Sequence, residues 1–196
     1  MRVFLAVPSD PLWVDSARGL VESLRGSLPR ASWTRAESWH LTLLFLGDVS
    51  GGFVDRFAEA VAGTAFETVA GEIQAAPPVV FPEHGRPRVL GVGFAPSPGV
   101  EALGELAAVA RKTAMGLGWR EESHKPSHPH VTFARVREPW SLAAVNDYRG
   151  RVEGWRFPSW LARSCVLFES RLEREGAVHT PLHEWTFQGG PRGVRA

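Results

Sequence analysis

The sequence is poor in several features that mark particular classes of protein. Among 196 residues there is one cysteine, Cys165, so no internal disulfide can form, which favours a reducing compartment. No apolar run is long enough to span a membrane, and the apolar start, residues 1–8, is too short for a signal segment. We therefore expect a cytoplasmic protein with no membrane partner and a buried, chemically inert Cys165.

An excess of charge is also absent. Lysine and arginine number 22 against 21 aspartate and glutamate residues, which gives a formal net charge of +1. A protein that wraps long nucleic acid binds it through many phosphates and needs a surplus of basic residues. The balance argues against that class and predicts that any contact with nucleic acid covers only a few nucleotides.

The composition is that of a folded globular chain, with 44% hydrophobic and 22% charged residues. No linker or low-complexity segment divides it, so we expect a single domain over residues 1–196 and a monomer with no obligate protein partner. Helical spacing of apolar residues predicts helices at 11–27, 54–65, 98–115 and 141–148. Extended patterns predict strands at 3–7, 39–46, 72–75, 88–94, 130–133, 166–169 and 178–187. Strands interleaved with a few helices indicate an α+β fold in which helices back antiparallel sheets.

The most informative feature is a short motif that occurs twice. His40 and Thr42 lie two positions apart in one predicted strand, and His130 and Thr132 repeat the spacing in another. Side chains alternate between the faces of a strand, so each pair points to one side. One such pair alone is typical of a structural hydrogen bond, but the second copy favours a catalytic interpretation.

Two histidines with two hydroxyl groups suit the cleavage of a phosphodiester without a metal ion. One neutral imidazole can take a proton from the attacking oxygen while the other, as imidazolium, gives one to the leaving oxygen. Threonine hydroxyls can donate hydrogen bonds to the non-bridging oxygens, where negative charge is held. Because both histidines must flank one phosphorus atom, we expect the two strands to face each other across a cleft.

The two motifs also carry a resemblance to a known family. Residues 40–47 (HLTLLFLG) and 129–135 (PHVTFAR) resemble the signature motifs of the 2H phosphoesterase superfamily, and in particular RNA 2′,3′-cyclic phosphodiesterases, also called 2′-5′ RNA ligases. The resemblance implies a bilobal α+β fold with two sheets around a central cleft and one His-x-Thr strand in each lobe. It also implies that no cofactor or metal ion is needed.

For individual residues, the resemblance implies that His40 and His130 are the catalytic pair and that Thr42 and Thr132 bind the phosphate. It further suggests that Phe45 and Arg135 hold the terminal base. Simple alternation places neither of these two on the face of its own histidine, so they are expected there only if the strands bend.

The reaction implied is hydrolysis of a 2′,3′-cyclic phosphate at an RNA end to a 2′-phosphate, and reversible 2′-5′ RNA ligation is a second reaction that the resemblance suggests. We favour His130 as the base for water and His40 as the acid for the 3′ oxygen, although the near-symmetric motif leaves the opposite assignment open. Other substrates also stay open: a cyclic ADP-ribose phosphate, or 2′,5′-linked oligonucleotides. Two alternatives belong to other functional classes: a non-catalytic module that binds RNA ends, and a metallohydrolase.

The remaining histidines give weaker signals. His128 and His130 could chelate a metal ion, but no obvious third ligand follows, so we place His128 at the rim of the cleft, as a lower-ranked substrate contact. His124 and Lys125 could add positive charge from the preceding loop. His179 and His183, four positions apart in a predicted strand, are expected to share a face and to pack at the edge of a sheet.

Overall fold

The computed structural model describes residues 1–62, 71–120, 128–173 and 176–187. Its helices are α1 (Pro11–Ser27), α2 (Gly51–Ala62), α3 (Pro98–Gly116) and α4 (Leu142–Gly154), with a short 3-10 helix at Ala36–Ser38. Its strands are β1 (Arg2–Pro8), β2 (Ser32–Trp33), β3 (His40–Asp48), β4 (Glu72–Ile73), β5 (Ala75–Phe81), β6 (Val89–Phe94), β7 (His130–Arg135), β8 (Trp160–Leu161), β9 (Ser164–Glu173) and β10 (Gly176–Thr186).

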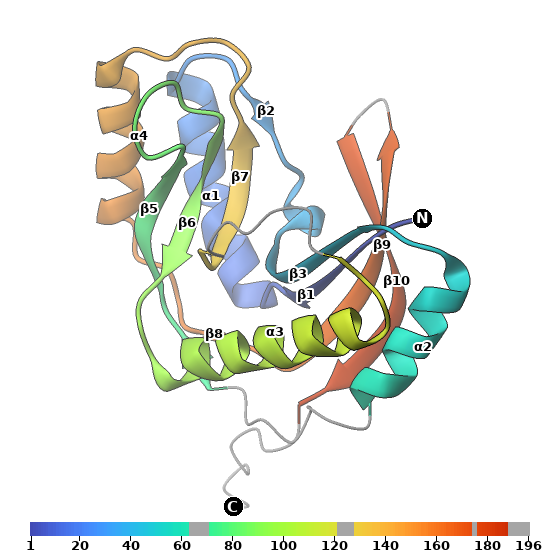
Figure 1. Ribbon diagram of the computed structural model, residues 1–196. Helices are drawn as coiled ribbons and strands as arrows, with labels where there is room; N and C mark the ends of the chain where they lie inside the picture. Colours follow the sequence, from blue (N-terminus) through green and yellow to red (C-terminus); the bar gives the residue numbers. More distant parts are fainter. Residues whose placement is uncertain (63–70, 121–127, 174–175, 188–196) are drawn as a thin grey trace, which may run out of the picture.

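Two four-stranded antiparallel sheets form the framework. The first sheet has the order β10-β9-β1-β3, the second has the order β2-β7-β6-β5, and β4 and β8 make a separate short pair. In Figure 1, α1 and α4 lie beside the second sheet, α2 lies beside the first, and α3 runs across the front of the molecule. Each four-stranded sheet contains one His-x-Thr strand, β3 or β7, which confirms the predicted α+β architecture.

The helices begin where the sequence places capping residues. Asp10 accepts hydrogen bonds from the backbone N–H groups of Leu12 and Trp13, at 2.9 and 3.4 Å, and Pro11 takes the first helical position. Ser97 caps α3 in the same way and is also followed by proline. The predicted helices at 11–27 and 98–115 are therefore confirmed.

Two helix boundaries differ from those predicted. Helix α2 begins at Gly51, earlier than expected, and positions 63–65 of the predicted helix lie outside the described residues. Helix α4 continues to Gly154 rather than ending at residue 148, because Val152 extends the buried row formed by Val145 and Tyr148.

The segment around Pro77 and Pro78 is a strand, where we expected extended structure only over 72–75. Strand β5 passes through both prolines at the edge of the second sheet. An edge strand needs hydrogen bonds on one side only, so a residue without a backbone N–H is tolerated there. Sequence pattern alone treats such prolines as a break, which explains the wrong prediction.

One connected core joins the two sheets. The fully buried Trp13 of α1 lies with its ring centroid 6.2 Å from that of Trp39, just before β3, and 6.1 Å from that of Phe133 in β7. Cys165 is fully buried, as predicted, and burial raises the pKa of its thiol. In the described part of the chain, no helix has the length and apolar character needed to cross a membrane.

Candidate active site

The two His-x-Thr strands pair with their neighbours in the same pattern. In the first sheet, β3 runs antiparallel to β1, and in the second, β7 runs antiparallel to β6. The register pairs are His40 with Pro8 and Thr42 with Ala6 on one side, and His130 with Gly93 and Thr132 with Gly91 on the other. The two halves of the candidate site therefore share one backbone arrangement, as the repeated motif predicts.

Both strands also contain a β-bulge at the same place, directly after the threonine. Leu43 has no register partner in β1, and Phe133 has none in β6. A bulge sets two residues against one on the partner strand, so the alternation of faces shifts by one position beyond it. The buried neighbours Leu43 and Leu44 in one strand, and Phe133 and Ala134 in the other, show this shift.

The bulges bring Phe45 and Arg135 to the face of the histidines. Phe45 is opposite Phe4 and Thr42 is opposite Ala6, two residues further along β1, so Phe45 and Thr42 share a face. In the second sheet, Arg135 is opposite Val89 and Thr132 is opposite Gly91, two residues further along β6, so Arg135 and Thr132 also share a face. Phe45 is 61% exposed, so its ring is available to stack on a base. The objection from simple alternation is removed, although the roles of both side chains stay predictions.

Each histidine is held by the same hydrogen bond to the residue two positions before it. Nδ1 of His40 lies 2.7 Å from the carbonyl oxygen of Ser38, and Nδ1 of His130 lies 2.7 Å from that of His128. A carbonyl oxygen only accepts, so Nδ1 carries the proton in both rings. Nε2 of each ring is then the nitrogen that can exchange a proton with a substrate.

Burial makes both imidazoles hard to protonate. The pKa of His40 is lowered to about 4, mainly by burial and to a smaller extent by the charges of His179 and His130, while the bond to the Ser38 carbonyl acts in the opposite direction. Burial also lowers the pKa of His130, with added effects from Arg135 and His128. The influence of His130 on His40 reaches from one sheet to the other and follows from the close approach of β3 and β7.

A residue that sequence reasoning missed, Thr34, ties the two halves together. Nε1 of Trp39 donates to Oγ1 of Thr34 at 2.8 Å, and that hydroxyl lies 2.9 Å from the carbonyl oxygens of Thr132 and Phe133. Trp39 precedes His40, whereas Phe133 is the bulged residue of β7 and Thr132 comes directly before it. The only sequence signal for this contact is a threonine in a polar stretch, which is too common to single out.

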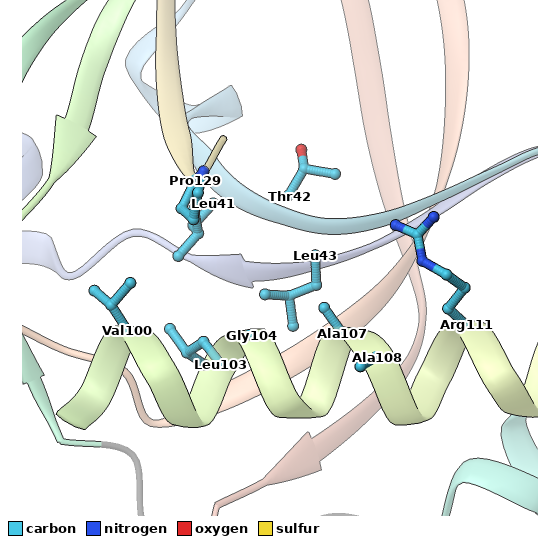
Figure 2. A pocket seen from close by; sticks show the side chains of 10 residues that line it. All are labelled: Leu41, Thr42, Leu43, Val100, Leu103, Gly104, Ala107, Ala108, Arg111 and Pro129. Atoms are coloured by element: carbon cyan, nitrogen blue, oxygen red, sulfur yellow. The ribbon is translucent and has the colours of Figure 1, made fainter. Parts of the chain in front are cut away.

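The hydroxyl of Thr42 points away from helix α3. In Figure 2 it lies on one side of β3, while Leu41 and Leu43 lie on the side of α3. Those two leucines help to line a cavity of about 220 Å³ between β3 and α3, with Arg111 at one end. Thr42 is also among the residues that line this cavity, but its hydroxyl lies on the other side of β3, so we do not assign the cavity to the candidate active site.

Among the other histidines, the structure contradicts the shared face of His179 and His183, and the substrate contact of His128 stays a prediction. His128 is exposed and supplies its carbonyl to His130, and its ring lies 5.9 Å from that of Phe81. His179 and His183 do not share a face, because the register of β10 shifts between Pro181 and His183. His179 instead lies against His40, with ring centroids 5.2 Å apart. His124 and Lys125 lie outside the described residues.

No three histidine, cysteine, aspartate or glutamate side chains of the described segments gather closely enough to hold a metal ion. A metal-independent reaction remains a prediction from the two-histidine arrangement.

Comparison with known proteins places the chain in a family. A protein of Archaeoglobus fulgidus named RNA 2′,3′-cyclic phosphodiesterase is 32% identical over 188 residues, which cover 93% of this chain and 98% of the relative. The chain belongs to the LigT-like phosphoesterases. The family model described as LigT like Phosphoesterase matches residues 12–91, which include the first motif.

Solved structures agree on the fold of this LigT-like phosphoesterase. A Thermus thermophilus protein superposes with a TM-score of 0.75 at 24% identity, over 96% of this chain and 99% of that one. E. coli LigT complexed with 3′-AMP superposes with a TM-score of 0.69 at 21% identity, over 96% of this chain and 98% of that one. The bilobal 2H phosphoesterase fold predicted from the motifs is confirmed.

Proposed function

We propose that this protein hydrolyses the 2′,3′-cyclic phosphate at the end of an RNA and leaves a 2′-phosphate. The observation that carries the proposal is the duplicated half-site, in which His40 and His130 are bonded alike through Nδ1 and accompanied by Thr42 and Thr132. The name of the Archaeoglobus relative supports the choice of substrate. The proposal also takes the site to work without a metal ion or cofactor.

In the proposed reaction, a water oxygen attacks phosphorus and the bond from phosphorus to the 3′ oxygen breaks. Nε2 of His130 takes the proton from water, and Nε2 of His40 gives its proton to the 3′ oxygen. Thr42 and Thr132 donate hydrogen bonds to the non-bridging oxygens, which carry the charge of the transition state. The two imidazoles end in each other's starting protonation state, so His130 must release a proton and His40 must regain one, by exchange with solvent, before the next cycle.

The low pKa of His40 bears on this assignment. An acid must hold a proton when the substrate is bound, but a pKa of about 4 leaves the imidazole of His40 neutral near pH 7. The phosphodiester is an anion, and its charge raises the pKa of a nearby imidazole. Under the proposal, His40 therefore gains its proton as the substrate binds.

The expected ligand is a short RNA end. Phe45 and Arg135, which share the histidine faces of their strands, are proposed to hold the terminal base between a ring and a guanidinium group. With a net charge of +1, the protein offers few contacts to further phosphates. Lengthening the RNA beyond a few nucleotides should therefore change the affinity little at moderate salt, and a steep gain with length would contradict this part of the proposal.

The decisive experiment incubates the protein, in EDTA, with an oligonucleotide that ends in a 2′,3′-cyclic phosphate, and identifies the product against both monoester standards. We expect a 2′-phosphate, and a loss of turnover by orders of magnitude in His40→Ala and in His130→Ala. His183→Ala, which alters an exposed histidine of β10, is the matched control. Near-normal turnover in either catalytic variant would refute the mechanism.

The same assay separates the alternatives. Loss of activity in EDTA indicates a metallohydrolase, and binding without turnover indicates a module that only recognises RNA ends. A 3′-phosphate product keeps the chemistry but reverses the leaving group. Cyclic ADP-ribose phosphate and 2′,5′-linked oligonucleotides, tested in parallel, show whether RNA is the preferred substrate. Adding an RNA with a 5′-hydroxyl end to the same assay tests the 2′-5′ ligation, in which that hydroxyl replaces water as the nucleophile.

We also propose that residues 1–196 act as one domain, since the buried residues of both sheets form one connected cluster. A single cooperative unfolding transition seen by two independent probes is the expected result. The cytoplasmic location and the monomeric state stay predictions.

A further inference from the structure

The ring of His40 packs against another imidazole, and no such ring contact is found at His130 among the described residues. The ring of His179 lies 5.2 Å from the ring of His40, with the two planes at 89°. At the other half-site, the ring that packs closest against His130 is that of Phe81, at 5.1 Å. The two catalytic histidines share a backbone arrangement but differ in the side chains that surround them.

The register of the first sheet explains how His179 reaches this position. His179 is opposite Ser170 of β9, two residues from Phe168, which is opposite Phe4 of β1. These side chains share one face of the sheet, and the ring of Phe4 lies 4.7 Å from that of His40 and 4.9 Å from that of His179. His40 is thus enclosed by two phenylalanine rings and one imidazole.

His179 carries a polar atom that packing alone does not explain. Its Nδ1 is buried and has no hydrogen-bond partner within the described part of the chain. A buried polar group without a partner destabilises a fold. A phenylalanine would fill the same space without that penalty, as Phe4 and Phe168 do beside it. The presence of an imidazole at this position is therefore not explained by its shape alone.

The charges around His40 supply a further reason for this imidazole. The charges that act on His40 come from His179 in β10 and His130 in β7. The residues of β1 and β9 that contact its ring, Phe4 and Phe168, carry no charge. A proton on His179 lowers the pKa of His40. Burial also lowers the pKa of His179 itself, so both rings resist protonation and their charges oppose each other.

We propose that His179 is a positioning residue for His40: it packs edge-on against the catalytic ring and, when it binds a proton, opposes a proton on His40. This inference rests on the function proposed above only where it concerns turnover. It makes the two half-sites unequal, because the charges that act on His130 come from Arg135 of its own strand and from His128 just before that strand, whereas the ring packed edge-on against it is that of Phe81. His179 then limits the pH range over which His40 can carry the proton that it donates.

The test follows the histidine side chains by NMR as the pH of the substrate-free protein is lowered. His40 is assigned by the loss of its signals in His40→Ala. The variants are His179→Phe, which keeps a flat ring, and His179→Gln, which keeps a polar group, and neither of them titrates. His183→Gln is the control, since His183 is exposed on the other face of the same strand.

We expect the titration midpoint of His40 to rise by about half a pH unit or more in both His179 variants and to stay unchanged in the control. In the turnover assay, the limb of the pH profile that belongs to His40 should move in the same direction. An unchanged midpoint overturns the inference. So does a shift in only one of two folded variants, since that reports new contacts rather than the lost charge. If one variant fails to fold, the titration of the other variant tests the inference.

Because the titration needs no substrate, it tests the inference even if the protein does not hydrolyse cyclic phosphates.

Discussion

Trp39 donates a hydrogen bond of 2.8 Å from its indole Nε1 to Oγ1 of Thr34. The same hydroxyl lies 2.9 Å from the backbone carbonyls of Thr132 and Phe133. Because Trp39 precedes His40 and Thr132 follows His130 by two positions, this contact connects the starts of the two half-sites. It links the residue just before β3, a strand of the first sheet, to β7 of the second sheet.

We therefore predict that Thr34→Val lowers both stability and turnover. The substitution keeps the shape but leaves the partly buried indole N–H without its partner, which costs about 1–3 kcal/mol. Chemical denaturation should show that loss of stability. We also expect kcat to fall, because the two histidines are no longer held in a fixed relative position. Thr186→Val, at an exposed position of β10, is the control and should change neither quantity. A variant of normal stability and normal kcat would show that the link is dispensable.

The two threonines should act on the transition state rather than on substrate binding. We predict that Thr42→Val and Thr132→Val each lower kcat by about 10²–10³-fold, the usual effect of removing one donor to a developing charge. The corresponding serine variants keep a hydroxyl and should retain most of the activity. Steady-state kinetics with a cyclic-phosphate-ended oligonucleotide measures both. A change confined to KM would mean that the threonines only hold the ground state.

Much of the fold could be predicted from the sequence because its signals are local. The proline and the capping aspartate at the start of α1, and the alternation in the strands, act over a few residues and need no knowledge of tertiary contacts. The repeated His-x-Thr motif likewise identifies the candidate site, since two copies of a rare pair are hard to explain by packing alone.

What the sequence could not give are features that depend on the partner strand. The bulges at Leu43 and Phe133 exist only relative to β1 and β6, and they decide that Phe45 and Arg135 share the face of the histidines. The same holds for His179, which a register shift in β10 separates from His183. Pattern reasoning assumes unbroken alternation, so it assigns such residues to the wrong face.

The choice of acid and base can be tested with an altered leaving group. When sulfur replaces the bridging 3′ oxygen of the cyclic phosphate, the leaving thiolate needs no proton. If His40 is the acid, His40→Ala should lose far less activity on the sulfur substrate than on the natural one, while His130→Ala should lose equally on both. The opposite pattern would exchange the two roles, and single-turnover kinetics on both substrates provides the measurement.

Acid should destabilise the protein through His40. The folded-state pKa is about 4 against an ordinary value of 6.5, so between these values the unfolded chain binds a proton that the folded chain does not. Stability is complete above the upper value and falls as the pH approaches the lower one, by about 3 kcal/mol at most. Urea unfolding at pH 7 and pH 4 should show a smaller loss for His40→Gln than for the wild type. Equal losses in both proteins would mean that His40 titrates normally when folded, and His183→Gln controls for an exposed histidine.

The exposed ring of Phe45 should matter only when the substrate carries a base. Stacking on an aromatic ring contributes about 1–3 kcal/mol per base, so Phe45→Ala should raise KM for a nucleotide substrate by about ten-fold or more with little change in kcat. An abasic ribose 2′,3′-cyclic phosphate offers nothing to stack, and its kinetics should be the same in wild type and variant. Leu172→Ala, which removes another exposed apolar side chain from the first sheet, should affect neither substrate. If the substitution raises KM for the abasic compound as much as for the nucleotide, Phe45 stabilises the strand rather than binding the base.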